Sequence, residues 1–184
     1  DHHVISTLDD IAWLLNVRGA DVRYLPVAVA HAIVHDNSVE LFIDRTKVDA
    51  ELASDLEADN VVIRPYSDFL KAVGELGGTV LFSPEQISAG TADALPENVR
   101  LVEQTNLPTV LKARKNSTEL EHIRKVMIRD GVAMARFLHW LDESLRSESE
   151  EEDITEISAE LKLNDFRSQG EHFVSPSFRT ISAY

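Results

Sequence analysis

The chain has 184 residues, of which 43% are hydrophobic and 27% charged, a balance typical of folded globular proteins. Its formal charge of −14 argues against binding to nucleic acid or to anionic lipid, because like charges repel. Cysteine is absent from the sequence, which excludes disulfides, a thiolate nucleophile and a cysteine-based zinc site. No apolar run approaches the roughly 20 residues that cross a bilayer, and the first residues do not resemble a signal peptide. We therefore expect a cytoplasmic protein that binds neither nucleic acid nor membrane.

Short β-branched runs alternate with amphipathic stretches in the first part of the chain. The runs predict strands at Val4–Thr7, Val27–Val34, Val39–Ile43, Val61–Arg64, Thr79–Phe82 and Val99–Glu103. The stretches between them predict helices at Asp9–Leu15, Thr46–Leu56, Asp68–Leu76 and Glu85–Leu95. Asp36-Asn37-Ser38 joins two strands as a hairpin, and Ser67 is suited to cap a helix. This order predicts an α/β fold, with a mixed sheet flanked by helices.

The pattern changes after Pro108. Between Asn116 and Arg146 there is no proline, and apolar residues recur every three or four positions, which predicts one long amphipathic helix. Asn116 and Glu119 have the spacing of a capping box at its start. We therefore expect a domain boundary near Ala113, with domains at 1–112 and 113–184.

The last segment has three parts. Ser147–Asp153 is an acidic connector, best explained as a solvated loop. Ile154–Gln169 is predicted as a second amphipathic helix, which Gly170 ends. Phe173–Tyr184 is predicted as the beginning of a strand.

The residues offer few candidates for catalysis. His31 and His35 lie in a β-type run, where four residues span roughly 13 Å, so they are too far apart to share one metal ion. Neither a Gly-x-Ser-x-Gly nucleophile motif nor a Gly-rich phosphate loop occurs in the sequence. Asp9, Asp10 and Asp44 follow strands, as carboxylates do in two-metal nucleases, but Asp9 or Asp10 also suits a helix cap.

Several segments, in order along nearly the whole chain, resemble aminopeptidase P, the Xaa-Pro aminopeptidase of the three-domain type. The most specific are Leu8–Asp21 (LDDIAWLLNVRGAD), Leu111–Asn116 (LKARKN), Ile154–Ala159 (ITEISA) and Phe173–Ser182 (FVSPSFRTIS). The resemblance implies that residues 1–112 form a middle domain of the creatinase amino-terminal, ribonuclease-H-like kind. It also implies that residues 113–184 begin a "pita-bread" α+β catalytic domain of the same metallopeptidase superfamily.

The resemblance further implies a dinuclear metal centre, usually with two manganese ions, which activates water against the peptide bond before proline. In the family, the ligands lie downstream of the segment that matches Phe173–Ser182. We therefore expect no catalytic residue and no metal ligand in this chain, and we expect the fragment to be inactive. The resemblance places Phe178 at the substrate cleft, and Asn16, Arg18 and Asp21 on a loop that faces another domain.

The expected parent protein thus removes an N-terminal residue that precedes proline, and its partner is a peptide with proline second. The alternative is a non-catalytic module of the same fold, used for dimerisation or for control of access to a cleft. The apolar face of the Asn116–Arg146 helix favours the alternative, since without further chain to cover it we expect self-association.

Overall fold

The computed structural model describes residues 1–146 and 154–183. They belong to two compact units, Asp1–Arg114 and Lys115–Tyr184.

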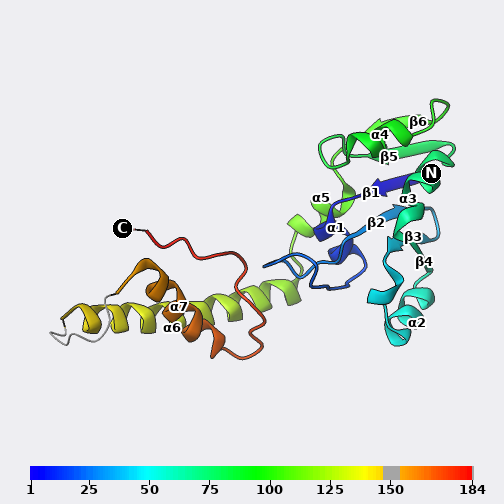
Figure 1. The fold of residues 1–184 in the computed structure, drawn as a ribbon. Coiled ribbons are helices and arrows are strands. Elements are labelled where there is room, and N and C mark those ends of the chain that lie inside the picture. Colours follow the sequence, from blue (N-terminus) through cyan, green and yellow to red (C-terminus); the bar gives the residue numbers. More distant parts are fainter. Residues whose placement is uncertain (147–153, 184) are drawn as a thin grey trace. The chain divides into compact units, whose positions relative to one another are not determined.

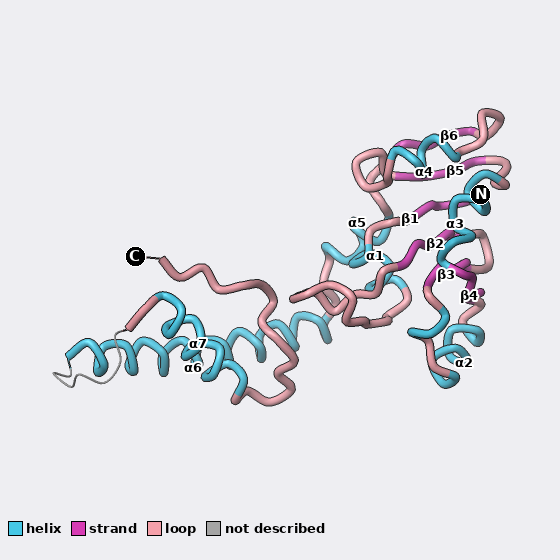
Figure 2. Tube along the Cα trace, viewed as in Figure 1, coloured by secondary structure: helices cyan, strands magenta, loops and turns pink. Residues whose placement is uncertain are grey.

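Unit 1 is built on a six-stranded sheet with the order β4-β3-β2-β1-β5-β6 (Figure 1). The strands are β1 (His2–Ile5), β2 (Ala30–Val34), β3 (Val39–Ile43), β4 (Val61–Pro65), β5 (Thr79–Phe82) and β6 (Arg100–Glu103). Strand β2 runs antiparallel to β1 and β3, whereas the other neighbouring pairs are parallel. The predicted mixed α/β sheet is confirmed, and Figure 2 shows its strands in magenta, connected along the chain by helices in cyan and by loops.

The sheet has an apolar cluster on each face, because successive residues of a strand point to opposite sides. Val4 belongs to one cluster and Ile5 to the other. The Ile5 cluster includes residues from the helices α1 (Leu8–Leu14) and α2 (Ala50–Ala58), and the Val4 cluster includes residues from α3 (Phe69–Gly74). Full burial of one such aliphatic side chain contributes about 1.5–3 kcal/mol, so the two clusters hold the sheet and its helices together.

Capping side chains set several boundaries that differ from the predicted ones. The helix expected at Thr46–Leu56 is a 3-10 turn, Arg45–Lys47, followed by α2. At the start of the 3-10 turn, the Asp44 carboxylate accepts a hydrogen bond from the Thr46 amide (3.0 Å). At the start of α2, the Asp49 carboxylate accepts one from the Leu52 amide (2.8 Å). Each cap starts its own element, and the single helix is thereby divided.

Two further predicted helices are shorter than expected. Ser67 does not cap α3, since its hydroxyl bonds to the neighbouring Asp68 and a 3-10 turn, Tyr66–Asp68, precedes the helix. The helix expected at Glu85–Leu95 is reduced to α4 (Ala89–Ala94), because the Ser88 hydroxyl accepts from the Thr91 amide and starts it late.

The last helix of unit 1, α5 (Leu107–Ala113), was not predicted. Pro108 lies in its first turn, where the missing amide hydrogen costs nothing and the fixed φ favours the helix. The proline after which the sequence pattern changes therefore helps to begin a helix.

Unit 2 consists of α6 (Ser117–Arg146), α7 (Glu156–Ser168) and the segment that follows them. The predicted capping box at α6 is confirmed: the Asn116 amide donates to Glu119 Oε2 (2.8 Å), and the Glu119 amide to Asn116 Oδ1 (2.9 Å). The strand predicted at Phe173–Tyr184 is wrong for the described residues 173–183, which contain no strand. The acidic connector Ser147–Asp153 lies outside the described residues.

None of the helices formed by residues 1–146 and 154–183 combines the length and the apolarity needed to cross a membrane.

Candidate functional site

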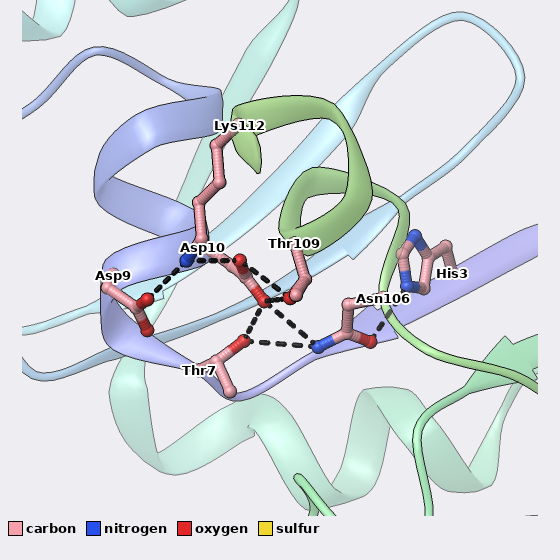
Figure 3. A network of polar contacts seen from close by, with 7 residues as sticks. All are labelled: His3, Thr7, Asp9, Asp10, Asn106, Thr109 and Lys112. Carbon is pink, nitrogen blue, oxygen red and sulfur yellow. Dashed lines mark hydrogen bonds and ion pairs between the residues drawn. The ribbon is translucent and has the colours of Figure 1, made fainter. Parts of the chain in front are cut away.

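A buried carboxylate, Asp10 of α1, forms the centre of a polar network in unit 1 (Figure 3). Its Oδ2 accepts hydrogen bonds from the Thr7 hydroxyl (2.5 Å), the Thr109 hydroxyl (2.7 Å) and the Asn106 amide (3.2 Å). Its Oδ1 lies 2.8 Å from the Nζ of Lys112. The network therefore joins the first turn of α1 to residues in and just before α5, about a hundred residues later in the sequence.

The side-chain amide of Asn106 fixes the tautomer of His3. Its Nδ2 donates to both Asp10 and Thr7, so its Oδ1 is the atom that lies 3.1 Å from His3 Nε2. An amide oxygen only accepts, hence His3 must carry a hydrogen on Nε2. Because burial is the largest influence on His3 and lowers its pKa, the neutral Nε2–H form fits this position.

The network keeps the Asp10 carboxylate ionised. Burial by itself would raise the pKa of Asp10, but hydrogen bonds, first of all from Lys112, outweigh burial and leave the pKa below its ordinary value. Burial by itself would lower the pKa of Lys112. The hydrogen bonds from Lys112 to Asp10 and Asp9 outweigh burial and raise this pKa above its ordinary value. The two groups thus form a charge-assisted pair.

A carboxylate with no exposed surface and its lone pairs occupied by four donors cannot take a proton from a substrate. Asp10 is therefore an anchor for α5. The cap role considered for Asp9 or Asp10 is wrong, since the residue preceding α1 is Thr7 and neither aspartate caps it through its side chain.

The three residues predicted on an interface loop bond within unit 1. Asn16 has a positive φ of 51°, and Arg18 Nη1 donates to the carbonyl oxygens of Ala12 (2.8 Å) and Val17 (2.9 Å). Asp21 accepts from the Val29 amide and from Lys47 Nζ, both at 2.6 Å. The hydrogen bond from Lys47 is the main influence that lowers the pKa of Asp21. These contacts fix the shape of the loop.

Arg18 and Asp21 also line a cavity of about 160 Å³ within unit 1. Its other walls are mostly apolar side chains from β3 and α2, among them Leu41, Ile43 and Leu56. The cavity resembles in size those that take small apolar ligands.

Phe178, the residue predicted at a cleft, lines a groove of about 980 Å³ in unit 2. The groove lies between α6, α7 and the segment after α7, and its apolar lining is Val126, Met127, Phe166, Phe173, Val174 and Phe178. The Phe178 side chain is 67% exposed.

Ion pairs brace this groove. Arg167 of α7 contacts Asp130 of α6 through Nε (2.7 Å), and Arg129 contacts both the backbone and the carboxylate of Glu171. The guanidinium of Arg136 stacks 4.7 Å from the centre of the Phe166 ring. Two pairs of charged side chains on the groove walls, Arg167 with Asp130 and Arg129 with Glu171, are thus joined to each other.

A family model described as the creatinase/prolidase N-terminal domain matches residues 1–119. The chain belongs to this family. The predicted membership of the creatinase/prolidase superfamily is thereby confirmed. The mixed sheet with its flanking helices is the creatinase/prolidase N-terminal fold.

Curated relatives are similar over the whole chain. Xaa-Pro aminopeptidase 1 of Dictyostelium discoideum is 37% identical over 186 residues, which cover 100% of this chain and 29% of the relative. A probable Xaa-Pro aminopeptidase P of Arthroderma gypseum is 39% identical over 191 residues, which cover 98% of this chain and 29% of the relative. This creatinase/prolidase-family chain therefore spans less than a third of the length of these relatives.

Solved structures agree on the fold. The X-prolyl aminopeptidase of Caenorhabditis elegans, described as a cytosolic enzyme with a di-nuclear active site, matches with a TM-score of 0.90 and 32% identity. The match covers 100% of this chain and 30% of that protein. A Xaa-Pro dipeptidase of Bacillus anthracis has the same fold, with a TM-score of 0.64 and 16% identity, over 92% of this chain and 44% of that one.

A dinuclear centre of the kind in the nematode relative needs several converging ligands. In the creatinase/prolidase-family chain, residues 1–146 and 154–183 contain no group of three or more histidine, aspartate or glutamate side chains able to hold a metal ion. His31 instead contacts Ser6 and Tyr66, and His35 contacts His2 and Glu40. The described residues do not fit the metal centre, so no catalytic step is assigned to them.

Sequence reasoning missed the Asp10 network. Asp10 was noticed for its position after a strand, whereas Asn106, Thr109 and Lys112 are separated from it by most of unit 1. The useful signal was a run of three polar residues at helical spacing, three apart from Asn106 to Thr109 to Lys112, which places them on one side of α5.

Proposed function

We propose that this chain is part of a longer, metal-dependent Xaa-Pro aminopeptidase, which hydrolyses the bond after an N-terminal residue that precedes proline. Residues 1–112 would be its middle domain, and residues 113–184 the start of its pita-bread catalytic domain. The observation that carries the proposal is the 37% identity to Xaa-Pro aminopeptidase 1 of Dictyostelium discoideum over the whole chain. The TM-score of 0.90 to the nematode X-prolyl aminopeptidase supports it.

In this proposal the parent's two metal ions, which we expect to be manganese, are held by side chains outside residues 1–184. The chain alone is then inactive, and its contribution is structural. Asp10 and Lys112 fix α5 to the body of unit 1, from which the chain continues into α6.

The groove along α6 and α7 supports a role for Phe178 at the substrate cleft. An apolar wall suits the ring of a proline in the second position of a peptide, because apolar surfaces are removed from water together. For the loop of Asn16, Arg18 and Asp21, we propose contact with another domain of the parent. The hydrogen bonds of Arg18 and Asp21 hold the loop in one shape, so little conformational freedom would be lost when another domain binds it. A cytoplasmic location, with peptides rather than nucleic acid or membranes as partners, completes the proposal.

Peptide hydrolysis tests the proposal directly. The parent polypeptide and the 184-residue chain are each incubated with manganese and a peptide that has proline second, and with a matched peptide that has alanine second. We expect the parent to release the first residue from the proline peptide only, and the chain to release nothing. Turnover by the chain, or no preference for proline by the parent, would overturn the assignment.

A second candidate is a module for self-association. Among the described residues of unit 2, the buried hydrophobic side chains are Ala133 and Leu163. Many large apolar side chains are exposed, including Met127, Ile128 and Ile181. Apolar surface on this scale is typical of an interface, and the oligomeric state of the chain in solution tests the candidate.

A further inference from the structure

Four side chains from neighbouring strands form a continuous polar chain across the sheet of unit 1. Arg64 Nε of β4 lies 3.0 Å from Glu40 Oε1 of β3, and Glu40 Oε2 lies 3.3 Å from Nε2 of His35, which follows β2. His35 Nδ1 lies 2.7 Å from Nδ1 of His2 on β1. The two imidazole rings meet edge to face, with centroids 4.9 Å apart and an interplanar angle of 84°.

The contact between the two Nδ1 atoms restricts where protons can reside. At 2.7 Å it must be a hydrogen bond, with a hydrogen on one Nδ1 and a lone pair on the other. Glu40 accepts from His35 Nε2, so in the neutral pair the lone pair is on His35 Nδ1 and His2 Nδ1 donates. One added proton goes to His2 Nε2 and leaves this bond in place. A second added proton puts a hydrogen on both Nδ1 atoms, and the bond is lost.

We propose that His2 and His35 are a proton-sharing pair that fastens the start of β1 to the end of β2, and that releases this end of the sheet when both rings are protonated. The pair lies next to the last two residues joined in the β1–β2 ladder, His3 and Val34. Its release therefore loosens the β2 side of β1 at its first residue, while His2 stays paired with Val80 of β5 on the other side.

The surrounding charges set when the second proton binds. Burial lowers the pKa of His2 most, and the facing His35 lowers it next. The carboxylate of Asp36 and the Gly77 backbone act in the opposite sense. On the side of His35 that faces away from His2, Glu40 and Arg64 form an ion pair. This side therefore carries one charge of each sign. The repulsion between the two rings therefore separates the binding of the first proton from that of the second.

Nitrogen-detected NMR of the uniformly labelled 184-residue chain tests this inference. Two-bond couplings between ring hydrogens and nitrogens report the protonation of each Nδ1 and Nε2 during a pH titration. We expect the two rings to titrate in separate, coupled steps, and the His3 and Val34 amide signals to move with the second step only. Independent titration of the rings, or amide signals that ignore the second step, would overturn the proposal.

Matched variants distinguish the titration of the His2–His35 pair from other effects of acid on the protein. In His35→Gln we expect the pKa of His2 to rise, since one of its lowering influences is removed, and the second step to disappear. In Glu40→Gln, which keeps both rings, the two coupled steps must persist. His139→Gln, at an exposed histidine of α6, is the control and must leave His2 unchanged. A pKa of His2 that is the same in His35→Gln as in the natural sequence contradicts the inference, whatever the stability of the variants.

Discussion

Lys112 of α5 places its Nζ 2.8 Å from Oδ1 of Asp10 of α1, and the Asp10 side chain has no exposed surface. The same ammonium group also bonds to Asp9, which is well exposed. One cation thus holds a buried and an exposed carboxylate of the same helix turn, and the two are expected to differ strongly in their contribution to stability.

Asp10→Asn should lower the free energy of unfolding of unit 1 by on the order of 3 kcal/mol, because Lys112 loses its buried partner and an amide nitrogen faces existing donors. Urea unfolding, followed by the fluorescence of Trp13 of α1 in a Trp140→Phe background, measures the change.

Asp9→Asn is the matched control for that experiment. Its ion pair with the same lysine is exposed to solvent, so the expected loss is ~0–1 kcal/mol. Equal losses in the two variants would contradict the role given to Asp10.

Gly19→Ala should destabilise unit 1 by about 1–3 kcal/mol, because overpacking forces the backbone to shift. A Cβ atom at Gly19 would lie 2.8 Å from the Cβ and the backbone nitrogen of Ala28. Gly77→Ala tests the specificity of this effect, since no atom lies within 4 Å of the added Cβ and the site is exposed. A shift of the thermal midpoint with Gly77→Ala as large as that with Gly19→Ala would refute the close contact.

Acid should destabilise unit 1 before its carboxylates are protonated. Burial lowers the pKa of His3 and of His31 from the ordinary value of 6.5. Between the folded pKa and 6.5 the unfolded chain binds more protons, so the free energy of unfolding falls as the pH falls below 6.5. The pKa of Asp10 is also lowered, and its contribution, present above 3.8, is lost as the pH falls through the folded value.

Urea midpoints measured from about pH 8 to about pH 5 check this dependence. In His31→Phe the slope should be shallower, because the ring that stacks on Phe69, with centroids 3.9 Å apart, is kept while its titration is removed. His172→Gln changes an exposed histidine and should leave the slope as it is. A urea midpoint that does not change with pH in this range would contradict the lowered pKa values of the buried histidines.

The chain should self-associate in a concentration-dependent manner, since many apolar side chains of α6 remain exposed in unit 2. Met127 and Ile128 are among the most exposed apolar residues of this helix. We expect Met127→Glu with Ile128→Glu to shift the sedimentation velocity profile towards the monomer. Lys125→Glu alters the charge of the same helix without removing apolar surface, and should leave the profile unchanged. If the chain with the natural sequence stays monomeric at all concentrations, the apolar face of α6 is not a self-association interface.

Local pattern was enough to predict most of unit 1. Alternation around Asp36-Asn37-Ser38 indicated the hairpin of β2 and β3, and the Asn116–Glu119 spacing indicated the cap of α6, because both signals lie within a few residues. Helix α5 was missed, because Pro108 was noted only as the point after which the pattern changes. The strand predicted at the end of the chain was wrong because β-branched residues alone do not make a strand, and no described strand pairs with residues 173–183.

The candidate site was harder to predict for a physical reason. The Asp10 network depends on residues at opposite ends of unit 1, and no local pattern shows that Asn106 and Thr109 converge on α1. The place of Phe178 at a substrate cleft stays a prediction, which came only through resemblance to a family. Apolar spacing on α7 was a weak guide as well, since its buried residue is Leu163, whereas Ile157 and Leu161 are exposed.

The central claim is that residues 1–184 support a metal centre whose ligands lie elsewhere in the parent protein. Metal analysis after equilibrium dialysis against manganese, on the 184-residue chain and on the parent polypeptide, tests it most directly. We expect the parent to retain manganese in stoichiometric amount and the chain to retain none. Stoichiometric manganese on the chain, lost when its own carboxylates or histidines are replaced, would contradict the account.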